Sequence, residues 1–244
     1  MASPTPQAPI RMEQTKQAAD LAVAAIKAVL VAIAGFPIPA SKRNALSVAL
    51  LRASIDHAHA LALLIAIHPW EFGSSSLALH RVQIETLLRG AFFAKEATDD
   101  EVEYFIKHDE MPKRPNKDGQ SKRLNHKTLA PLVGDVLAVG SSTKIVDMVQ
   151  YSWDVLCGMV HGGKSTLITY TNEQIGFRTE PGEIVEVVGN ALALAHLAMV
   201  GVCYVSTADD QEKSDLFQEP RNTRIAFRDY LKSVFPKPSD MTGS

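Results

Sequence analysis

Three ionisable side chains on two apolar segments could together carry out acid–base or phosphate chemistry. Arg81 and Glu85 stand four residues apart within residues 75–97, a segment whose apolar pattern predicts a helix, so they share one helical face. His161 ends a second predicted helix, residues 142–161, just before a pair of glycines. Histidine titrates near neutral pH, while arginine binds phosphate oxygens. If the two helices converge, Arg81, Glu85 and His161 form a polar pocket inside the bundle.

The same charged residues also have a purely structural interpretation. Burying a polar group without a partner costs about 1–3 kcal/mol, so charged side chains on apolar helices tend to pair with one another. Such pairs would fix how neighbouring helices align and would need no ligand. Spacing alone does not separate this interpretation from a functional pocket, and both are kept open at this point.

A short basic segment is the candidate for nucleic-acid binding. Residues 111–127 contain six lysines and arginines and a single acidic residue, Asp118, in a stretch that two prolines and a glycine predict to be a loop. Such a segment can bind RNA phosphates, chiefly through Lys113, Arg114, Lys122 and Arg123. No aromatic residues are interleaved with these cations, so a solvated loop is the competing interpretation.

The elements that must position these residues are almost all helical. Apolar residues at helical spacing predict helices over residues 12–34, 41–68, 75–97, 127–139, 142–161 and 183–206. Thr98 and Glu101 form a capping box, which predicts a further short helix to residue 108. Residues 166–178 alternate around a polar centre at Asn172, which predicts a small β-hairpin. We therefore expect an all-α fold, a helical bundle of about seven helices with one small β-hairpin insertion.

Breaks in this pattern predict the domain organisation. Residues 1–10 are rich in proline and predict a flexible tail, and residues 11–206 form the helical bundle domain. Residues 207–244 are expected to hold a polar linker, 207–219, and a short amphipathic helix with Pro220 near its first turn. Small residues, chiefly alanine, are frequent in helices 12–34, 41–68 and 183–206, so these three should approach closely and form the centre of the bundle.

Composition narrows the possible partners. Of the 244 residues, 46% are hydrophobic and 21% charged, which excludes a wholly disordered chain. The net charge of −2 gives no overall attraction for nucleic acid, so RNA binding would need a local patch. Cys157 and Cys203 are isolated from each other and no residues have metal-ligand spacing, so we expect neither a metal nor a cofactor.

Location is inferred from the N-terminus and from one uncharged segment. The N-terminus lacks the charged and apolar regions of a signal peptide, so the expected location is the cytoplasm. Residues 187–205 contain no Asp, Glu, Lys or Arg over a length that could span a bilayer. They include Asn190 and His196, however, and a buried central helix is the preferred interpretation, with membrane association the weaker alternative.

Two short motifs carry a family resemblance. Arg81-Val-Gln-Ile-Glu85 and Leu156-Cys-Gly-Met-Val-His161-Gly162 resemble a group of uncharacterised bacterial helical proteins near the HEPN-like superfamily, over about residues 40–205. The resemblance implies a dimeric helical bundle. It also implies a metal-independent ribonuclease of the kind found in toxin–antitoxin and phage-defence systems.

The HEPN-like signature is an arginine, then four to six residues, then a histidine on the same helix. Arg52-Ala-Ser-Ile-Asp-His57 has this spacing, and His59 is also within range. The resemblance implies that His57 would be the general base and that Arg52 would stabilise the phosphorane charge. The residue after the arginine is Ala53, where the family usually has a polar residue. A packing or surface role for Arg52 and His57 is therefore the competing interpretation.

Two functions from different classes follow. The first is a HEPN-like metal-independent ribonuclease or RNA-binding protein in bacterial defence, acting as a homo-oligomer or with a protein partner. The second is a non-catalytic interaction or ligand-sensing module whose charged residues form a structural network. The ribonuclease or RNA-binding function requires that Arg81, Glu85 and His161 lie together in the folded protein.

Overall fold

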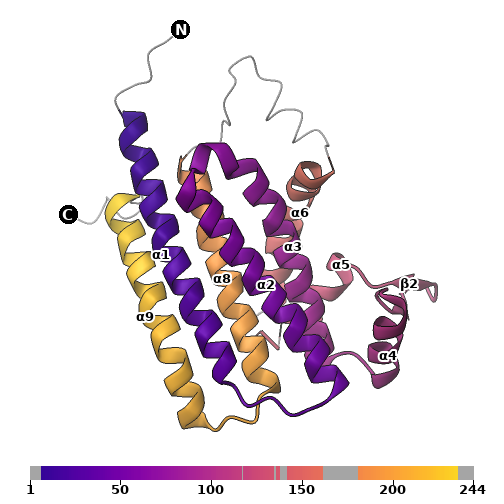
Figure 1. The fold of residues 1–244 in the computed structure, drawn as a ribbon. Helices are drawn as coiled ribbons and strands as arrows, with labels where there is room; N and C mark the ends of the chain where they lie inside the picture. The colour runs from indigo at the N-terminus through magenta and orange to yellow at the C-terminus, as the bar shows by residue number, and fades with distance from the viewer. Residues whose placement is uncertain (1–6, 117, 135, 138–141, 162–180, 236–244) are drawn as a thin grey trace.

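Long helices lie side by side in the computed structural model and form a bundle (Figure 1). The structure describes residues 7–116, 118–134, 136–137, 142–161 and 181–235. Within them the bundle consists of α1 (Gln7–Gly35), α2 (Lys42–Ile67), α3 (Pro69–Lys95), α6 (Ser142–Val160), α8 (Pro181–Val205) and α9 (Asp210–Val234). The shorter α4 (Asp99–His108), α5 (His126–Leu129) and a two-stranded hairpin lie to one side, beyond α3. The predicted class, all-α with a small β-hairpin, is confirmed.

The centre of the bundle is formed by α1, α2 and α8, which contact one another, as the small residues of these helices predict. Their alanines Ala18, Ala25, Ala58 and Ala195 are fully buried, so little side-chain volume separates the helix axes. Leu51 of α2 shows how tight the packing is, because it lies against a glycine of α3 and a glycine of α8. A Cβ on Gly90 would stand 2.9 Å from the Leu51 backbone nitrogen, and one on Gly201 would stand 2.9 Å from Leu51 Cδ1.

We predict that Gly90→Ala destabilises the protein by about 1–3 kcal/mol, although alanine is the better helix former. The added methyl group would meet the α2 backbone, which cannot rotate away as a side chain can, so α2 and α3 would have to separate. Urea unfolding followed by circular dichroism measures the change. Gly189→Ala is the matched control, because its Cβ would meet only Phe227 at an ordinary 3.7 Å. Equal stability of the two variants would contradict the prediction.

Local signals placed the helix ends correctly where a capping group is present. The Ser41 side chain accepts a hydrogen bond from the Asn44 backbone N–H at the start of α2. Thr98 and Glu101 form the predicted capping box at the start of α4. These bonds use backbone groups only a few residues away, so the sequence alone defines them.

The segment expected to be a basic loop instead forms a hairpin of β1 (Lys113–Pro115) and β2 (Ser121–Arg123). The strands are antiparallel, with Lys113 opposite Arg123. Asn116 shapes the turn by accepting from the backbone N–H groups of Asp118 and Gln120, and Gly119 adopts φ 75°. Strands of three residues are too short to show alternation, so the loop prediction was wrong for these residues. The hairpin predicted over residues 166–178 lies outside the described residues.

The C-terminal segment also differs from expectation, because α9 begins at Asp210 and not after Pro220. Asp209 and Glu212 form a capping box, and helix continues through Pro220. The expected linker over 207–219 is therefore mostly helical. α9 packs along α1, where Tyr230 Oη donates to the Gln14 carbonyl at 3.2 Å, so it belongs to the bundle. The helix predicted over 127–139 is shorter than expected, a single turn at α5.

Two buried histidines take part in hydrogen bonds that join α3 to α8 and α8 to α9. His80 Nδ1 bonds to Gln83 Oε1 at 2.9 Å, and Gln83 Nε2 donates to the Ala191 carbonyl of α8. His196 of α8 has the Pro220 carbonyl of α9 3.1 Å from Nε2. Burial lowers the pKa of both histidines, because the charged imidazolium is poorly solvated inside the bundle. Both rings are therefore expected to be neutral in the folded protein at pH 7.

We predict that the free energy of unfolding falls by about 1–3 kcal/mol between pH 7 and pH 5. Below the ordinary histidine pKa of 6.5, His80 and His196 become protonated in the unfolded chain. In the folded chain they stay neutral to lower pH, because burial lowers their pKa. Stability is therefore fully present above the ordinary pKa and is lost as the pH falls through it. Urea titrations across this range measure the slope, which His196→Gln should make shallower. Stability that is constant or rises towards pH 5 would count against this account.

Three described helices are long and apolar enough to cross a membrane by length and composition: Met12–Gly35, Lys42–Ile67 and Gly182–Val205. The sequence had singled out only the last of these. In the structure each contributes buried residues to the shared core. The expected cytoplasmic location is tested by neither observation.

Candidate functional site

Arg81 and His161 meet although 80 residues separate them in the sequence. α3 presents Arg81, and His161 directly follows the end of α6, a helix that packs against α3. Arg81 Nη1 lies 2.6 Å from His161 Nε2. A guanidinium group has no acceptor, so Arg81 donates and His161 Nε2 accepts. The Nε2 lone pair of His161 is therefore directed at the guanidinium of Arg81.

The Trp153 ring also contacts the guanidinium group of Arg81. Arg81 Cζ stands 5.1 Å from the centroid of the Trp153 ring, a cation–π distance. The Trp153 ring also stacks on His126, with centroids 3.7 Å apart and planes 15° from parallel. The Nε atom of Arg81 is buried and has no hydrogen-bond partner among the residues that the structure describes. In the described part of the chain, the contacts of the Arg81 guanidinium are thus with aromatic rings and not with an acidic group.

A cavity of about 350 Å³ opens beside this cluster, between α3, α6 and the segments that flank the hairpin. Three arginines and three carboxylates line it: Arg81, Arg89, Arg123, Glu85, Asp109 and Glu110. Arg89 pairs with Glu85 one turn away on α3, and Arg123 pairs with Glu110 at 2.7 Å. Within the described residues Arg81 makes no ion pair with a carboxylate. It is therefore the lining cation whose charge is left for an anion.

The chain matches a family of unknown function, DUF6988, over residues 51–231. The chain belongs to this family. No curated protein and no solved structure matches it. The matched range contains every residue that lines the cavity, together with His161, but leaves out α1. The expectation of an uncharacterised family is confirmed, while neither a HEPN-like relationship nor a bacterial origin follows from the match.

The three residues predicted to converge have different positions in the DUF6988 protein. Arg81 and Glu85 both line the cavity, as helical spacing predicted. His161 is exposed and reaches the site through its bond to Arg81. Glu85 is engaged by Arg89 and bonds to neither Arg81 nor His161 among the described contacts. Arg81 and His161 are thus the pair placed for joint chemistry.

The Arg52–His57 pair lies elsewhere in the DUF6988 protein, on α2. Arg52 is exposed and forms an ion pair with Asp56 at 3.2 Å, and His57 is half-buried. Five residues of helix rotate two side chains by about 140°, so Arg52 and His57 point to different sides of α2. Neither residue lines the cavity. His59, also on α2, has a lowered pKa because of burial and the nearby Lys27 charge, which outweigh the opposite effect of Asp56.

The four predicted RNA-binding cations divide into two groups. Arg114 is held inside the fold: it donates to both oxygens of Glu101 at 2.7 and 2.6 Å and to the Glu96 carbonyl. Arg123 pairs with Glu110 at the cavity. Lys113 and Lys122 are exposed, and no described carboxylate pairs with them. Two of the four predicted RNA-binding cations are therefore engaged by carboxylates of the protein itself.

Trp153 and His126 are the aromatic site residues that the sequence analysis did not identify. Trp153 is buried at 8% exposure, and its ring also lines the cavity. His126 starts α5 after Asn125, whose side chain caps that helix in a box with Thr128. This Asn-x-x-Thr signal was present in the sequence and could have placed His126 at a helix start. Nothing in the sequence pairs His126 with Trp153.

Proposed function

We propose that this DUF6988 protein acts on RNA and that Arg81 binds the phosphate in the cavity beside Trp153. The observation that carries the proposal is the position of Arg81: a lining guanidinium with an unsatisfied Nε–H and no carboxylate partner among the described residues. Phosphate oxygens are the acceptors that such a group lacks, and guanidinium–phosphate bonds are short and strong. Arg89 and Arg123 line the same cavity, but Glu85 and Glu110 pair with them, so the attraction for an anion depends on Arg81.

The Arg81–His161 bond supports metal-independent cleavage of the RNA backbone as the reaction. When a phosphate takes up Arg81, the Nε2 lone pair of His161 is released. His161 can then accept the proton of the ribose 2′-hydroxyl, whose oxygen attacks the phosphorus. The bond to the 5′-oxygen breaks, that oxygen takes a proton, and a 2′,3′-cyclic phosphate remains. His126, in the cavity lining, is the candidate acid, and Arg81 stabilises the phosphorane charge.

RNA incubated with the protein in EDTA tests this proposal. We expect cleavage with 2′,3′-cyclic phosphate ends, and a loss of rate of at least about 100-fold in His161→Ala. His57→Ala is the matched control, since it removes a half-buried histidine of α2 that neither lines the cavity nor, unlike His161, bonds to Arg81. The proposal fails if wild-type protein leaves RNA intact. It also fails if His57→Ala abolishes cleavage while His161→Ala does not.

A second candidate is a non-catalytic sensor that binds an RNA or nucleotide phosphate without cutting it. The observation that favours it is the pairing of Arg89 with Glu85 and of Arg123 with Glu110, which resembles a structural network more than a reaction centre. RNA that is bound in an Arg81-dependent manner, and recovered uncut, would support the sensor and exclude the ribonuclease.

The wider setting of the proposal rests on the sequence resemblance. We place the protein with HEPN-like bacterial defence proteins, as a cytoplasmic homodimer. Light scattering of the purified chain tests the dimer. Fractionation without detergent tests the location, and recovery only in the membrane pellet would instead favour insertion of the three apolar helices.

A further inference from the structure

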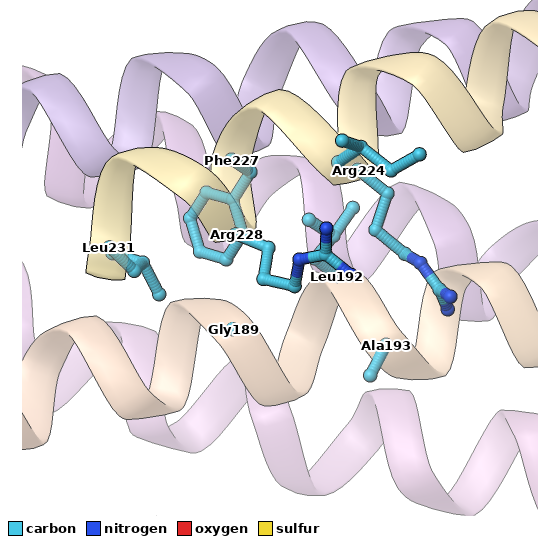
Figure 2. A pocket seen from close by; sticks show the side chains of 8 residues that line it. Gly189, Leu192, Ala193, Arg224, Phe227, Arg228 and Leu231 are labelled. Atoms are coloured by element: carbon cyan, nitrogen blue, oxygen red, sulfur yellow. The ribbon is translucent and has the colours of Figure 1, made fainter. Parts of the chain in front are cut away.

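A groove runs between α8 and α9 on the far side of the bundle from the hairpin. Both helices pack on α1 but contact each other at few positions. This leaves a cavity of about 230 Å³ between them. Its apolar lining comes from both helices, namely Gly189, Leu192, Ala193, Ile225, Phe227 and Leu231 (Figure 2).

Gly189 keeps this groove open. A Cβ at this position would stand 3.7 Å from Phe227 Cε1, so any larger side chain would cover the ring. Ala193, the next residue of α8 along the groove, is also small, and it is exposed. Ile225 on the facing helix is 39% exposed. Leu192 and Phe227 at the base of the groove are only 1% and 5% exposed, so the exposed apolar surface lies at its rim, at Ala193 and Ile225.

Two arginines on α9 place positive charge over this apolar surface. Figure 2 shows the Arg224 and Arg228 side chains extending from α9 along the groove towards α8. Among the described residues, Arg228 pairs only with its exposed neighbour Asp229, at 3.1 Å. Arg224 forms no ion pair within the part of the chain that the structure describes. Two cations without strong internal partners therefore border a narrow apolar slot.

We propose that the groove binds a medium-chain alkyl carboxylate. The alkyl chain would lie against Leu192, Phe227 and Leu231, and the carboxylate would accept hydrogen bonds from Arg224 and Arg228. Burial of apolar surface and charge-assisted hydrogen bonds would both favour binding. Pockets for drug-sized ligands hold about 300–1,000 Å³, so this smaller groove suits a single chain better than a ring system.

A free carboxylate fits the charges better than a membrane surface does. The cations of α9 include Arg221 and Lys232, which are as exposed as the other two but do not line the groove. An anionic bilayer would attract all four cations through its surface potential. A ligand seated in the groove would depend on Arg224 and Arg228 alone, and this difference can be measured.

Sodium octanoate titrated into the full chain by calorimetry is the test. We expect octanoate to bind at least about tenfold more tightly than acetate, which lacks the chain, or 1-octanol, which lacks the charge. Arg224→Ala/Arg228→Ala should weaken binding by about tenfold or more. Ala193→Leu, which fills the groove from an exposed position, should abolish it. Arg221→Ala and Ala49→Leu, at exposed positions outside the groove, should leave affinity within about twofold.

Four outcomes would overturn the proposal. If octanoate does not bind, or binds no better than 1-octanol, the groove does not recognise a carboxylate. If Arg221→Ala and Arg224→Ala weaken octanoate binding equally, the carboxylate is attracted by the general positive charge of α9 and not by a defined site. If Ala193→Leu binds octanoate as well as the wild type does, the ligand does not lie in the groove. The fourth outcome is that octanoate does not bind while the protein co-sediments with phosphatidylglycerol vesicles, and Ala193→Leu leaves this co-sedimentation unchanged. The cations of α9 would then bind a membrane surface. Circular dichroism of each variant shows that its fold is intact.

Discussion

Arg81→Ala is expected to lower kcat/KM for RNA cleavage by about 100- to 1,000-fold, the usual loss when one donor to a transition-state oxyanion is removed. Arg81 is the lining cation without a carboxylate partner among the described residues, so the developing phosphorane charge would lose its nearest guanidinium. The change also removes the bond that brings His161 to the edge of the cavity before RNA binds, since His161 does not itself line the cavity. Initial rates over a range of RNA concentrations measure the effect.

Two further variants make this expectation specific. Arg81→Lys keeps the charge but loses the planar fork and the stacking on Trp153, so it should recover only part of the rate. Arg52→Ala removes an exposed arginine of α2 and should leave kcat/KM within about twofold. A fully active Arg81→Ala would contradict the assignment of this residue. A loss in Arg52→Ala that exceeds the loss in Arg81→Ala would move the site to α2.

Arg114→Ala is expected to lower the free energy of unfolding by about 2 kcal/mol. Its guanidinium bonds to both oxygens of Glu101 and to the Glu96 carbonyl, and it lies 5.0 Å from the Phe92 ring. The Glu101 side chain is only 14% exposed, so the variant leaves a poorly solvated carboxylate without its cation. Arg114 itself is 31% exposed, which keeps the expected loss below that of a fully buried pair. Urea unfolding measures the change.

The control is Arg123→Ala, because Arg123 makes the other ion pair of the hairpin. Its partner Glu110 and Arg123 itself are 42% and 52% exposed, so this loss should stay below about 1 kcal/mol. Equal losses in the two variants would mean that the burial of Glu101 does not matter. A loss confined to Arg114→Ala supports a structural role for this cation, which the basic sequence pattern had assigned to RNA.

The Arg114 contribution should also depend on pH. Burial of Glu101 raises its pKa, but bonds from Arg114 and the Thr98 N–H, with the charges of Arg114 and Arg43, outweigh burial and lower it overall. The stabilisation is therefore present above the ordinary carboxyl pKa of 4.5 and is lost as the pH falls through the lowered value. The stability difference between wild type and Arg114→Ala should shrink in acid below this range.

The sequence by itself determined the helices and most of their ends. Thr98 and Glu101 cap α4 through bonds to backbone groups of neighbouring residues, and such bonds need no tertiary contact. The small residues of α1, α2 and α8 likewise predicted which helices form the centre. The short strands at Lys113–Pro115 and Ser121–Arg123 could not be predicted in this way, because three residues show no period.

Only the tertiary structure decided which charges are available for function. Helical spacing put Arg81 and Glu85 on one face, but it could not show that Arg89 would engage Glu85 while Arg81 met His161, 80 residues away. The same is true of Arg114, which becomes a structural residue because Glu101 and Phe92 lie beside it. The physical reason is that hydrogen bonds and ion pairs act over a few ångströms, and the packing of the helices alone brings distant residues within that range.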